Sequence, residues 1–416
     1  MLSASSWVLR AKRLAKRSPN RAALISLAVA HVFLVVLYFC SHGSKLEGVL
    51  ENNTVPSYNA MRDILIVPME DNSFLCEYSI EADQVDGGCV QQCAVPNVSN
   101  ENFTCYIRNN RAKEPFKIAD VTINHRGTPP DTKRKTVPPY LTLFYTGESN
   151  ESLGYHGSDE YLRLHDLYIS CHQHRKYYFT WARHHASLFS DIVEQNRVEA
   201  VSEQELWNDW SARHSAIAVF FTAGGSRRDD LVKELGKYYP VHNYGRKGRT
   251  NSTPPECAHL QNSRYELKIC VFRNYKYAIA LENTEETDYV TEKVYHALLA
   301  GSIPIYWGAP NADEFVPMGY RSIIDVEEFL PERMGRRGDW DYSNVSEEVL
   351  RLASHLRKLE ADEAAVKHKL SWRTVTDEHK WGPKFFDNLH HRDPTCDICT
   401  EALVKRREMR QRDSHK

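Results

Sequence analysis

The chain has 416 residues, of which 42% are hydrophobic, 26% charged and 11% aromatic. This is ordinary globular composition, so disorder, collagen and coiled coil are excluded as descriptions of the whole chain. A formal charge of −2 argues against a nucleic-acid protein held by a strong basic field, and the length suffices for two domains with separate cores.

The N-terminus has the pattern of a membrane anchor. Residues 1–21 contain six cations and no acid, and residues 22–40 form an apolar run broken only by Ser26 and His31. As a helix this run is about 28 Å long, close to the thickness of the bilayer core. The positive flank predicts a cytosolic N-terminus and a lumenal remainder. The rival is a cleaved signal peptide, but its apolar region is usually shorter and ends in an A-x-A site that is missing here.

A lumenal chain lies in an oxidising compartment, where cysteines pair and sequons are glycosylated. Nine of the ten cysteines follow the apolar run, so at least one is unpaired. We expect Cys257 and Cys270 to bridge locally, and the C-x-x-C pair Cys396 and Cys399 to join an early cysteine such as Cys76 or Cys89. The other candidate disulfide cysteines are Cys93 and Cys105, and the candidate glycosylation sites are Asn52, Asn97, Asn102, Asn251 and Asn344.

Short runs rich in β-branched and aromatic residues follow a polar stem at residues 41–59. The strands expected in residues 60–205 are Ile64–Val67, Ile118–Ile123, Tyr140–Tyr145, Leu167–Ser170 and Tyr177–Trp181. In residues 206–372, buried strands alternate with helices, which indicates a parallel, doubly wound sheet. The strands expected there are Ala216–Phe221, Pro240–Asn243, Tyr277–Leu281, Ile303–Trp307 and Ser322–Val326, and the main helices are Arg228–Tyr239, Thr291–Ala300 and Ser346–Leu359.

The stretch from Tyr277 to Pro317 is the densest in chemistry. The buried strand Ala278–Leu281 ends at Glu282 and Asn283, and ligands of parallel sheets bind at the carboxyl ends of strands. We expect Thr291 to cap the next helix, which places Lys293 in its first turn. A helix N-terminus favours anions, so a lysine there predicts a bound anion.

This stretch resembles the donor motif of the α1,3/α1,4-fucosyltransferases, glycosyltransferase family 10. The family pattern is a strand ending in Glu-Asn-(Ser/Thr), a polar spacer, Tyr-(Val/Ile)-Thr-Glu-Lys, and Gly-x-(Val/Ile)-Pro-(Val/Ile)-x-x-Gly. The matching segments here are 282–284, 289–293 and 301–308. Weaker similarity covers the helix from Arg228, the loop at residues 144–149 and the terminal C-x-x-C.

The resemblance implies a GT-B fold, an α/β architecture of two facing Rossmann-like domains, after a single transmembrane helix. Residues 60–205 would bind the acceptor and residues 206–372 GDP-fucose, followed by a C-terminal C-x-x-C segment at 373–404. The high charge of residues 405–416 predicts a disordered tail. The implied activity is inverting transfer of L-fucose from GDP-fucose to a hydroxyl of N-acetylglucosamine or glucose in a glycoprotein glycan, in α1,3 or α1,4 linkage. The implied location is the Golgi membrane, single-pass type II, with the catalytic part lumenal and a role in protein glycosylation.

The resemblance also implies roles for individual residues. Arg228 and Lys293 would neutralise the diphosphate, with Arg227 as a competitor of Arg228. Asn283 and Tyr289 would contact phosphates, and Glu292 would hold the ribose. Glu148 would be the general base and Glu151 is its rival, because a proline that often follows the second Glu-Ser is missing here. We expect the sequon at Asn150, beside this base, to be unmodified.

The chemistry requires these residue types. Cleavage of a glycosyl–phosphate bond leaves negative charge on the diphosphate, which fixed cations stabilise, and inversion needs one carboxylate to accept the acceptor proton.

No metal is expected to be required, and Mn²⁺ is expected at most to stimulate. The D-x-D at Asp339–Asp341 leaves a metal-dependent glycosyltransferase with another nucleotide sugar as an alternative. A non-catalytic, membrane-tethered, lectin-like protein is a second alternative, and the His- and Cys-rich pairs leave a zinc site as a third. Those pairs are Cys171 to His174, His184 with His185, and His390 with His391.

Overall fold

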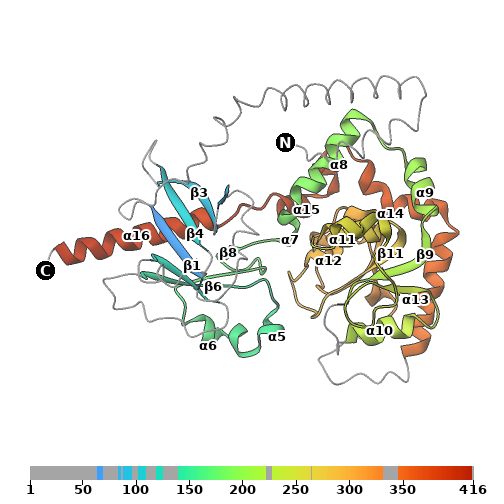
Figure 1. Cartoon of the computed structure of the whole chain (residues 1–416), viewed down its shortest axis with the longest axis horizontal. Helices are drawn as coiled ribbons and strands as arrows, with labels where there is room; N and C mark the ends of the chain where they lie inside the picture. Colours follow the sequence, from blue (N-terminus) through green and yellow to red (C-terminus); the bar gives the residue numbers. More distant parts are fainter. Residues whose placement is uncertain are drawn as a thin grey trace, which may run out of the picture. The chain divides into compact units, whose positions relative to one another are not determined.

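Two β-sheets and the helices around them make up the described part of the chain (Figure 1). The computed structural model describes residues 63–68, 83–85, 88–95, 102–108, 119–124, 139–221, 227–263, 265–330 and 345–414. All of them belong to one unit, Asn59–Lys416. The predicted anchor and stem, the sequons at Asn52, Asn97 and Asn344, and the D-x-D lie outside these ranges. Among the helices within them, none combines the length and the hydropathy that a bilayer span requires.

The first sheet has eight strands in the order β2-β3-β4-β1-β5-β6-β7-β8. From β4 to β8 all neighbours are parallel, whereas β3 is antiparallel to both β2 and β4. The prediction missed β2, β3 and β4, because their polar residues break the apolar runs. It also extended the last strand too far, since Thr180 caps a helix that begins at Trp181. The strands are β1 Ile64–Pro68, β2 Asp83–Val85, β3 Gly88–Ala94, β4 Asn102–Arg108, β5 Val121–Asn124, β6 Leu141–Tyr145, β7 Leu167–Ser170 and β8 Tyr177–Tyr178.

The second sheet is fully parallel, with the order β10-β9-β11-β12-β13, as the strand–helix alternation predicted. Every residue of the central strand β11 is buried, because helices cover the sheet and leave no face for water. Helix α12 packs on β11 and β12, and α11 lies beside it (Figure 1). The strands are β9 His214–Val219, β10 Val241–Asn243, β11 Tyr275–Leu281, β12 Ile303–Trp307 and β13 Ile324–Asp325.

The helices place apolar faces on these sheets. In α13 the predicted face is buried: Val349, Leu352, Ala353, Leu356 and Leu359. The α-helices are α5 Asn150–Leu153, α6 Asp159–Leu162, α7 Trp181–His184, α8 Ala186–Val198, α9 Glu203–Ser211, α10 Arg227–Leu235, α11 Glu266–Phe272, α12 Glu292–Ala300, α13 Val345–Glu360, α14 Glu363–Leu370, α15 Pro383–Leu389 and α16 Thr395–Ser414. Short 3₁₀ turns connect several of them, including Gly154–Gly157 after α5 and Ala312–Glu314 after β12.

The C-terminal helix corrects one prediction. Residues 405–416 were expected to be disordered, but α16 continues through Ser414 and packs on β1, β3 and β4. Arg406 is buried, and its guanidinium donates to the carbonyl of Asp63 at 2.7 Å and to the carboxylate of Asp120 at 3.2 Å. The high charge of this segment suggested a solvated tail, whereas one of its cations is paired in the interior.

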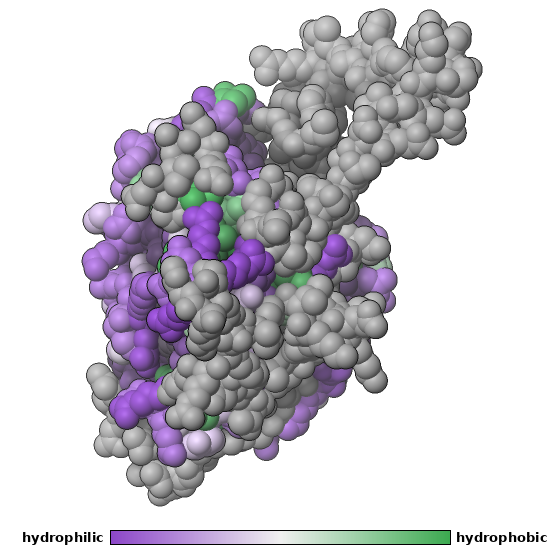
Figure 2. Space-filling model, turned by 90° about the vertical axis from the view of Figure 1, so that its left-hand side faces the viewer, coloured by the Kyte–Doolittle hydropathy of each residue, from purple (hydrophilic) through white to green (hydrophobic). Residues whose placement is uncertain are grey.

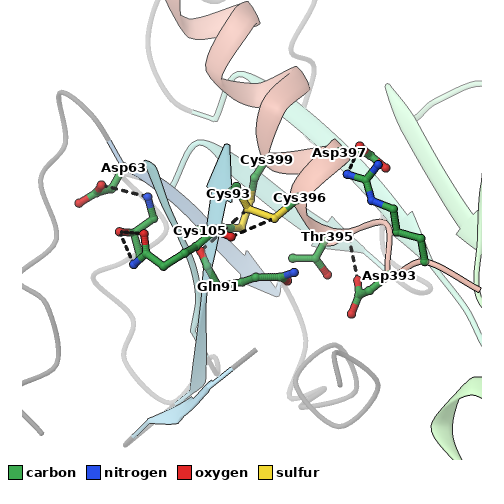
Figure 3. The surroundings of a disulfide bond; sticks show 12 residues. Asp63, Gln91, Cys93, Cys105, Asp393, Thr395, Cys396, Asp397 and Cys399 are labelled. Carbon is green, nitrogen blue, oxygen red and sulfur yellow. Dashed lines mark hydrogen bonds and ion pairs between the residues drawn. A yellow bond between two sulfur atoms is a disulfide. The ribbon is translucent and has the colours of Figure 1, made fainter. Parts of the chain in front are cut away.

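Two disulfides join α16 to the first sheet (Figure 3). Cys396 is bonded to Cys93 on β3, and Cys399 to Cys105 on β4, across 303 and 294 residues of sequence. The C-x-x-C does reach back to early cysteines, but the partners named from the sequence, Cys76 and Cys89, were wrong. Cys89 is itself disulfide-bonded.

The local bridge Cys257–Cys270 is confirmed. Cys171 is the free, buried thiol among the described cysteines, and an unpaired thiol was expected from the odd number of cysteines after the apolar run. Of the described candidate sequons, Asn102 is exposed on β4 and Asn251 is partly exposed, so both side chains reach solvent. Figure 2 shows the molecule from the side of the first sheet and α16, where the described surface is mainly hydrophilic.

Two buried histidines lie together, His185 at the start of α8 and His296 within α12. The rings of His185 and His296 are 5.3 Å apart, and both side chains are almost fully buried. Among the described residues, no hydrogen-bond partner faces Nε2 of His185 or either ring nitrogen of His296. Burial lowers the pKa of His185 to about 4 and that of His296 well below its ordinary value, so both rings are neutral at pH 7.

These histidines should make the fold acid-sensitive. Their folded-state pKa values lie below the unfolded value of about 6.5, so the unfolded chain binds more protons as the pH falls below 6.5. Stability is therefore retained above pH 6.5 and lost toward pH 4, by about 3 kcal/mol for His185 alone. We expect His296→Phe to flatten the dependence of the unfolding free energy on pH between 4 and 7, measured by denaturant titration. The exposed His368→Gln serves as control, and an unchanged slope in His296→Phe would contradict this account.

Candidate active site

The loop between β11 and α12 is organised by a buried carboxylate. Glu282, directly after β11, accepts hydrogen bonds from the backbone N–H of Thr291 at 2.8 Å and from its hydroxyl at 2.8 Å, and from the ammonium of Lys293 at 2.9 Å. A side chain at Gly308 would come within 2.5 Å of Glu282 Cγ, so glycine leaves room for this carboxylate. Glu282 therefore fixes the start of α12 and aims Lys293. Thr291 occupies the N-cap position as predicted, but its hydroxyl bonds to Glu282 and caps nothing.

Lys293 is a cation that hydrogen bonds hold in place and whose side chain is partly exposed to solvent. Its ammonium also donates to the hydroxyl of Thr291 at 2.6 Å, and a quarter of its side chain is exposed. Burial works to lower the pKa of Lys293, but Glu282 and Glu292 raise it above its ordinary value. The ammonium is therefore charged at neutral pH and available at the carboxyl end of β11.

A second cation converges on the same place. Arg228, near the start of α10, donates to the carbonyl of Leu281 at 3.3 Å, and it is close enough to Lys293 to work against that residue's positive charge. Two like charges held near one another favour an anion between them. The structure thus brings the two predicted cations together. Nothing is described for the side chain of the competing Arg227.

Glu292 faces α11. Its carboxylate pairs with Lys268 at 3.9 Å, and its side chain is 12% exposed. Burial works to raise the pKa of Glu292, but Lys293 and Lys268 hold it well below its usual range, so the group is ionised. The predicted contact with ribose stays a prediction. So does the phosphate contact of Asn283, whose exposed side chain donates to the hydroxyl of Ser152 at 3.1 Å.

Of the two candidate bases, Glu148 faces the loop between β11 and α12, residues 282–291, which is called the donor loop below. It follows β6, and its carboxylate accepts a hydrogen bond from the hydroxyl of Tyr289 at 3.4 Å. Burial raises the pKa of Tyr289 well above its ordinary value, and the charges of Glu282 and Glu148 add to this, so the phenol stays a neutral donor. Glu151 lies exposed on α5. The geometry therefore favours Glu148, which contacts Tyr289 in the loop that leads to Lys293.

Two carboxylates of this loop bond to neighbouring segments, Glu282 to Thr291 and Glu286 to His172, and neither contact was predicted from the sequence. Glu282 was read only as part of the motif, and Glu286 only as part of a polar spacer. The one signal in the sequence was the acidity of that spacer, which carries Glu285, Glu286 and Asp288 between a buried strand and a helix. Asp288 holds the loop in a left-handed turn with φ of 70°, and Asn311 donates to its carboxylate at 2.9 Å.

The zinc alternatives find no support in the described residues. Cys396 and Cys399 form disulfides, His390 pairs with Glu378, and His391 bonds to the carbonyl of Tyr178. No cluster of three or more His, Cys, Asp or Glu side chains within the described ranges could hold a metal ion. The Nδ2 atom of Asn150, where a glycan would be attached, donates to Glu286 at 2.5 Å, and the expectation that this sequon is unmodified stays a prediction.

Comparison with known proteins places the second sheet in a family. Residues 210–336 match the model of glycosyltransferase family 10 (fucosyltransferase), C-terminal region. GDP-fucose protein O-fucosyltransferase 3 of Bos taurus is 28% identical over 189 residues, which are 42% of this chain and 36% of the relative. The α-(1,4)-fucosyltransferase of Arabidopsis thaliana is 33% identical over 156 residues, which are 35% of this chain and 34% of the relative.

These alignments are partial, since the chain spans about a third of the length of these relatives. A crystal structure of an α1,3-fucosyltransferase aligns with 84% of this chain and 90% of its own, with a TM-score of 0.46 and 16% sequence identity. The matched residues 210–336 contain Arg228, Glu282, Tyr289 and Lys293. This chain therefore carries the C-terminal domain of glycosyltransferase family 10, the family of the α1,3- and α1,4-fucosyltransferases.

Proposed function

We propose that the chain is an inverting fucosyltransferase that moves L-fucose from GDP-fucose to a hydroxyl of N-acetylglucosamine or glucose in a glycoprotein glycan, in α1,3 or α1,4 linkage. The observation that carries the proposal is the pair Arg228 and Lys293 at the carboxyl end of β11, with Glu148 hydrogen-bonded to Tyr289 of the adjoining loop. Together with the family 10 match, it favours a GT-B enzyme whose two Rossmann-like halves, residues 60–205 and 206–372, bind acceptor and donor.

The residues divide the reaction between them. As the bond between fucose and phosphate breaks, Arg228 and Lys293 stabilise the charge on the departing GDP, so side chains supply what a divalent ion supplies elsewhere. Glu148 takes the proton of the acceptor hydroxyl as that oxygen attacks the sugar from the opposite face. The phenol of Tyr289, which donates to Glu148, orients the base.

The cellular setting is part of the same proposal. An anchor at residues 22–40 would hold the enzyme in the Golgi membrane with its catalytic part lumenal. The disulfides between α16 and the first sheet support an oxidising compartment. Sugar nucleotide and glycoprotein would then meet in that lumen.

A second acceptor class has an observation in its favour. One relative is named a GDP-fucose protein O-fucosyltransferase, so a serine or threonine hydroxyl of a protein is the alternative acceptor. Incubation of the lumenal part, residues 41–416, with GDP-fucose, defined glycans and folded protein acceptors decides between them, with product linkage read by glycosidase digestion. We expect glycan fucosylation that persists in EDTA. Loss of all transfer in EDTA, or no transfer from GDP-fucose to any acceptor, would overturn the proposal.

A further inference from the structure

One carboxylate of the donor loop holds groups from two loops of the first sheet. Glu286 Oε2 accepts the backbone N–H of Asn150 at 2.8 Å, and Oε1 accepts the side-chain amide of the same residue at 2.5 Å. Oε1 also lies 2.7 Å from Nε2 of His172, just after β7. The side chains of Glu286 and His172 are 19% and 4% exposed, so these bonds are shielded from water.

The partners of Glu286 are themselves held. The Nδ1 atom of His172 lies 2.9 Å from the hydroxyl of Ser170, so Nε2 carries the proton donated to Glu286 when that hydroxyl donates to Nδ1. The backbone N–H of Asn150 is the first in α5 and has no partner inside that helix. Glu286 therefore satisfies a donor that α5 leaves open.

Neighbouring hydrogen bonds also join the donor loop to the loops that follow β6 and β7. The hydroxyl of Ser149 donates to that of Thr284 at 3.0 Å, and Asn283 reaches Ser152. On the other side, the carboxylate of Asp288 accepts the backbone N–H of Gln173 at 2.9 Å. Among the described residues of the loop between β11 and α12, Glu286 bonds both to Asn150 after β6 and to His172 after β7, whereas the Asp288 carboxylate bonds to Gln173 after β7.

These bonds bear directly on the base. Glu148 immediately precedes Ser149 and Asn150, and it meets Tyr289 of the same donor loop. A shift of α5 away from Glu286 would move Glu148 relative to the cations that hold the leaving group. Misplacement by about 1 Å is enough to slow a reaction about 10²-fold.

We propose that Glu286 is a positioning residue that fixes the general base Glu148 at its working distance from the donor by holding Asn150 and His172. The inference rests on the proposed function for its effect on rate, while the hold on α5 is a structural claim. In this proposal the partners of Glu286 are Asn150 and His172, and Glu286 has no direct contact with fucose or the acceptor oxygen. It acts through the segment that carries the base.

Kinetics of Glu286→Ala and Glu286→Gln test the effect on rate. We expect Glu286→Ala to lower kcat about 10²-fold, with the KM for GDP-fucose and the Kd for GDP within about threefold of wild type. Glu286→Gln keeps one acceptor oxygen and should recover most of the rate, to within about tenfold of wild type. The exposed Glu160→Gln, on α6, is the charge-matched control. A kcat within threefold of wild type in Glu286→Ala, or a loss confined to donor KM, would overturn the proposal.

Two further measurements separate positioning from folding and from the reaction itself. Asn150→Ala removes one partner of Glu286, so it should lower kcat about tenfold and add little to Glu286→Ala in the double variant. Fully additive losses would overturn the shared role. Amide hydrogen exchange in residues 147–153 should be faster in Glu286→Ala than in wild type, which needs no turnover. Unchanged exchange would refute the hold on α5, whereas a wild type that transfers no fucose would refute the proposed function alone.

Discussion

Replacement of Lys293 by methionine is expected to lower fucose transfer about 10³-fold. The ammonium is one of two cations aimed at the carboxyl end of β11, and Arg228 alone leaves the charge on departing GDP half neutralised. Initial rates with GDP-fucose and the preferred acceptor give the size of the loss. Lys237→Met, which removes an exposed lysine after α10, is the control and should leave the rate unchanged.

The same substitution affects stability, and a double variant separates the two effects. Without Lys293, the carboxylate of Glu282 stays buried without its cation, at a cost of about 3 kcal/mol. Lys293→Met with Glu282→Gln removes that charge, so the melting temperature should recover in part while transfer stays lost. Near-normal turnover in Lys293→Met, or rescue of activity in the double variant, would remove Lys293 from the reaction.

Glu148→Gln is the second substitution with a large expected effect, a fall in kcat of about 10³-fold. Glutamine retains the shape of glutamate and still accepts the hydrogen bond from Tyr289, but it takes no proton from the acceptor. Binding of GDP, measured by calorimetry, should be unchanged.

The matched comparison is Glu151→Gln, three residues along on the exposed side of α5. We expect its kcat to stay within about threefold of wild type, since an exposed carboxylate outside the Tyr289 contact has no part in proton transfer. If Glu151→Gln were the slower of the two variants, the base would be Glu151 and the present assignment would be wrong.

Sequence patterns predicted the second sheet well because its strands are continuous apolar runs. Ile303–Trp307 has the predicted bounds, as does Leu167–Ser170 of the first sheet, and α12 begins one residue after the expected cap. Strand β4 was missed because asparagine, threonine and cysteine interrupt its apolar residues. Strand β3 was missed because its stability depends on pairing with β4, which its own sequence does not show.

The site was predictable where its residues are close in sequence. Glu282, Thr291 and Lys293 lie within one short segment. The motif therefore identified the segment, although it did not reveal the role of Glu282. Glu286 meets partners 136 and 114 residues away, and Tyr289 meets Glu148 across 141 residues. No local pattern encodes such contacts, and the same distance in sequence explains the wrong disulfide partners of Cys396 and Cys399.

The attachment of α16 to the first sheet has a consequence for biogenesis. Cys93 on β3 and Cys105 on β4 are synthesised 303 and 294 residues before their covalent partners. Cys93 and Cys105 therefore cannot form these two bonds until residues 396–399 have been synthesised. A nonsense mutation that removes only residues 395–416 would leave the active-site loops intact in sequence. It would remove both disulfides to the first sheet and the contact of Arg406 with Asp63. We expect such a product to be much less stable than the chain that retains α16.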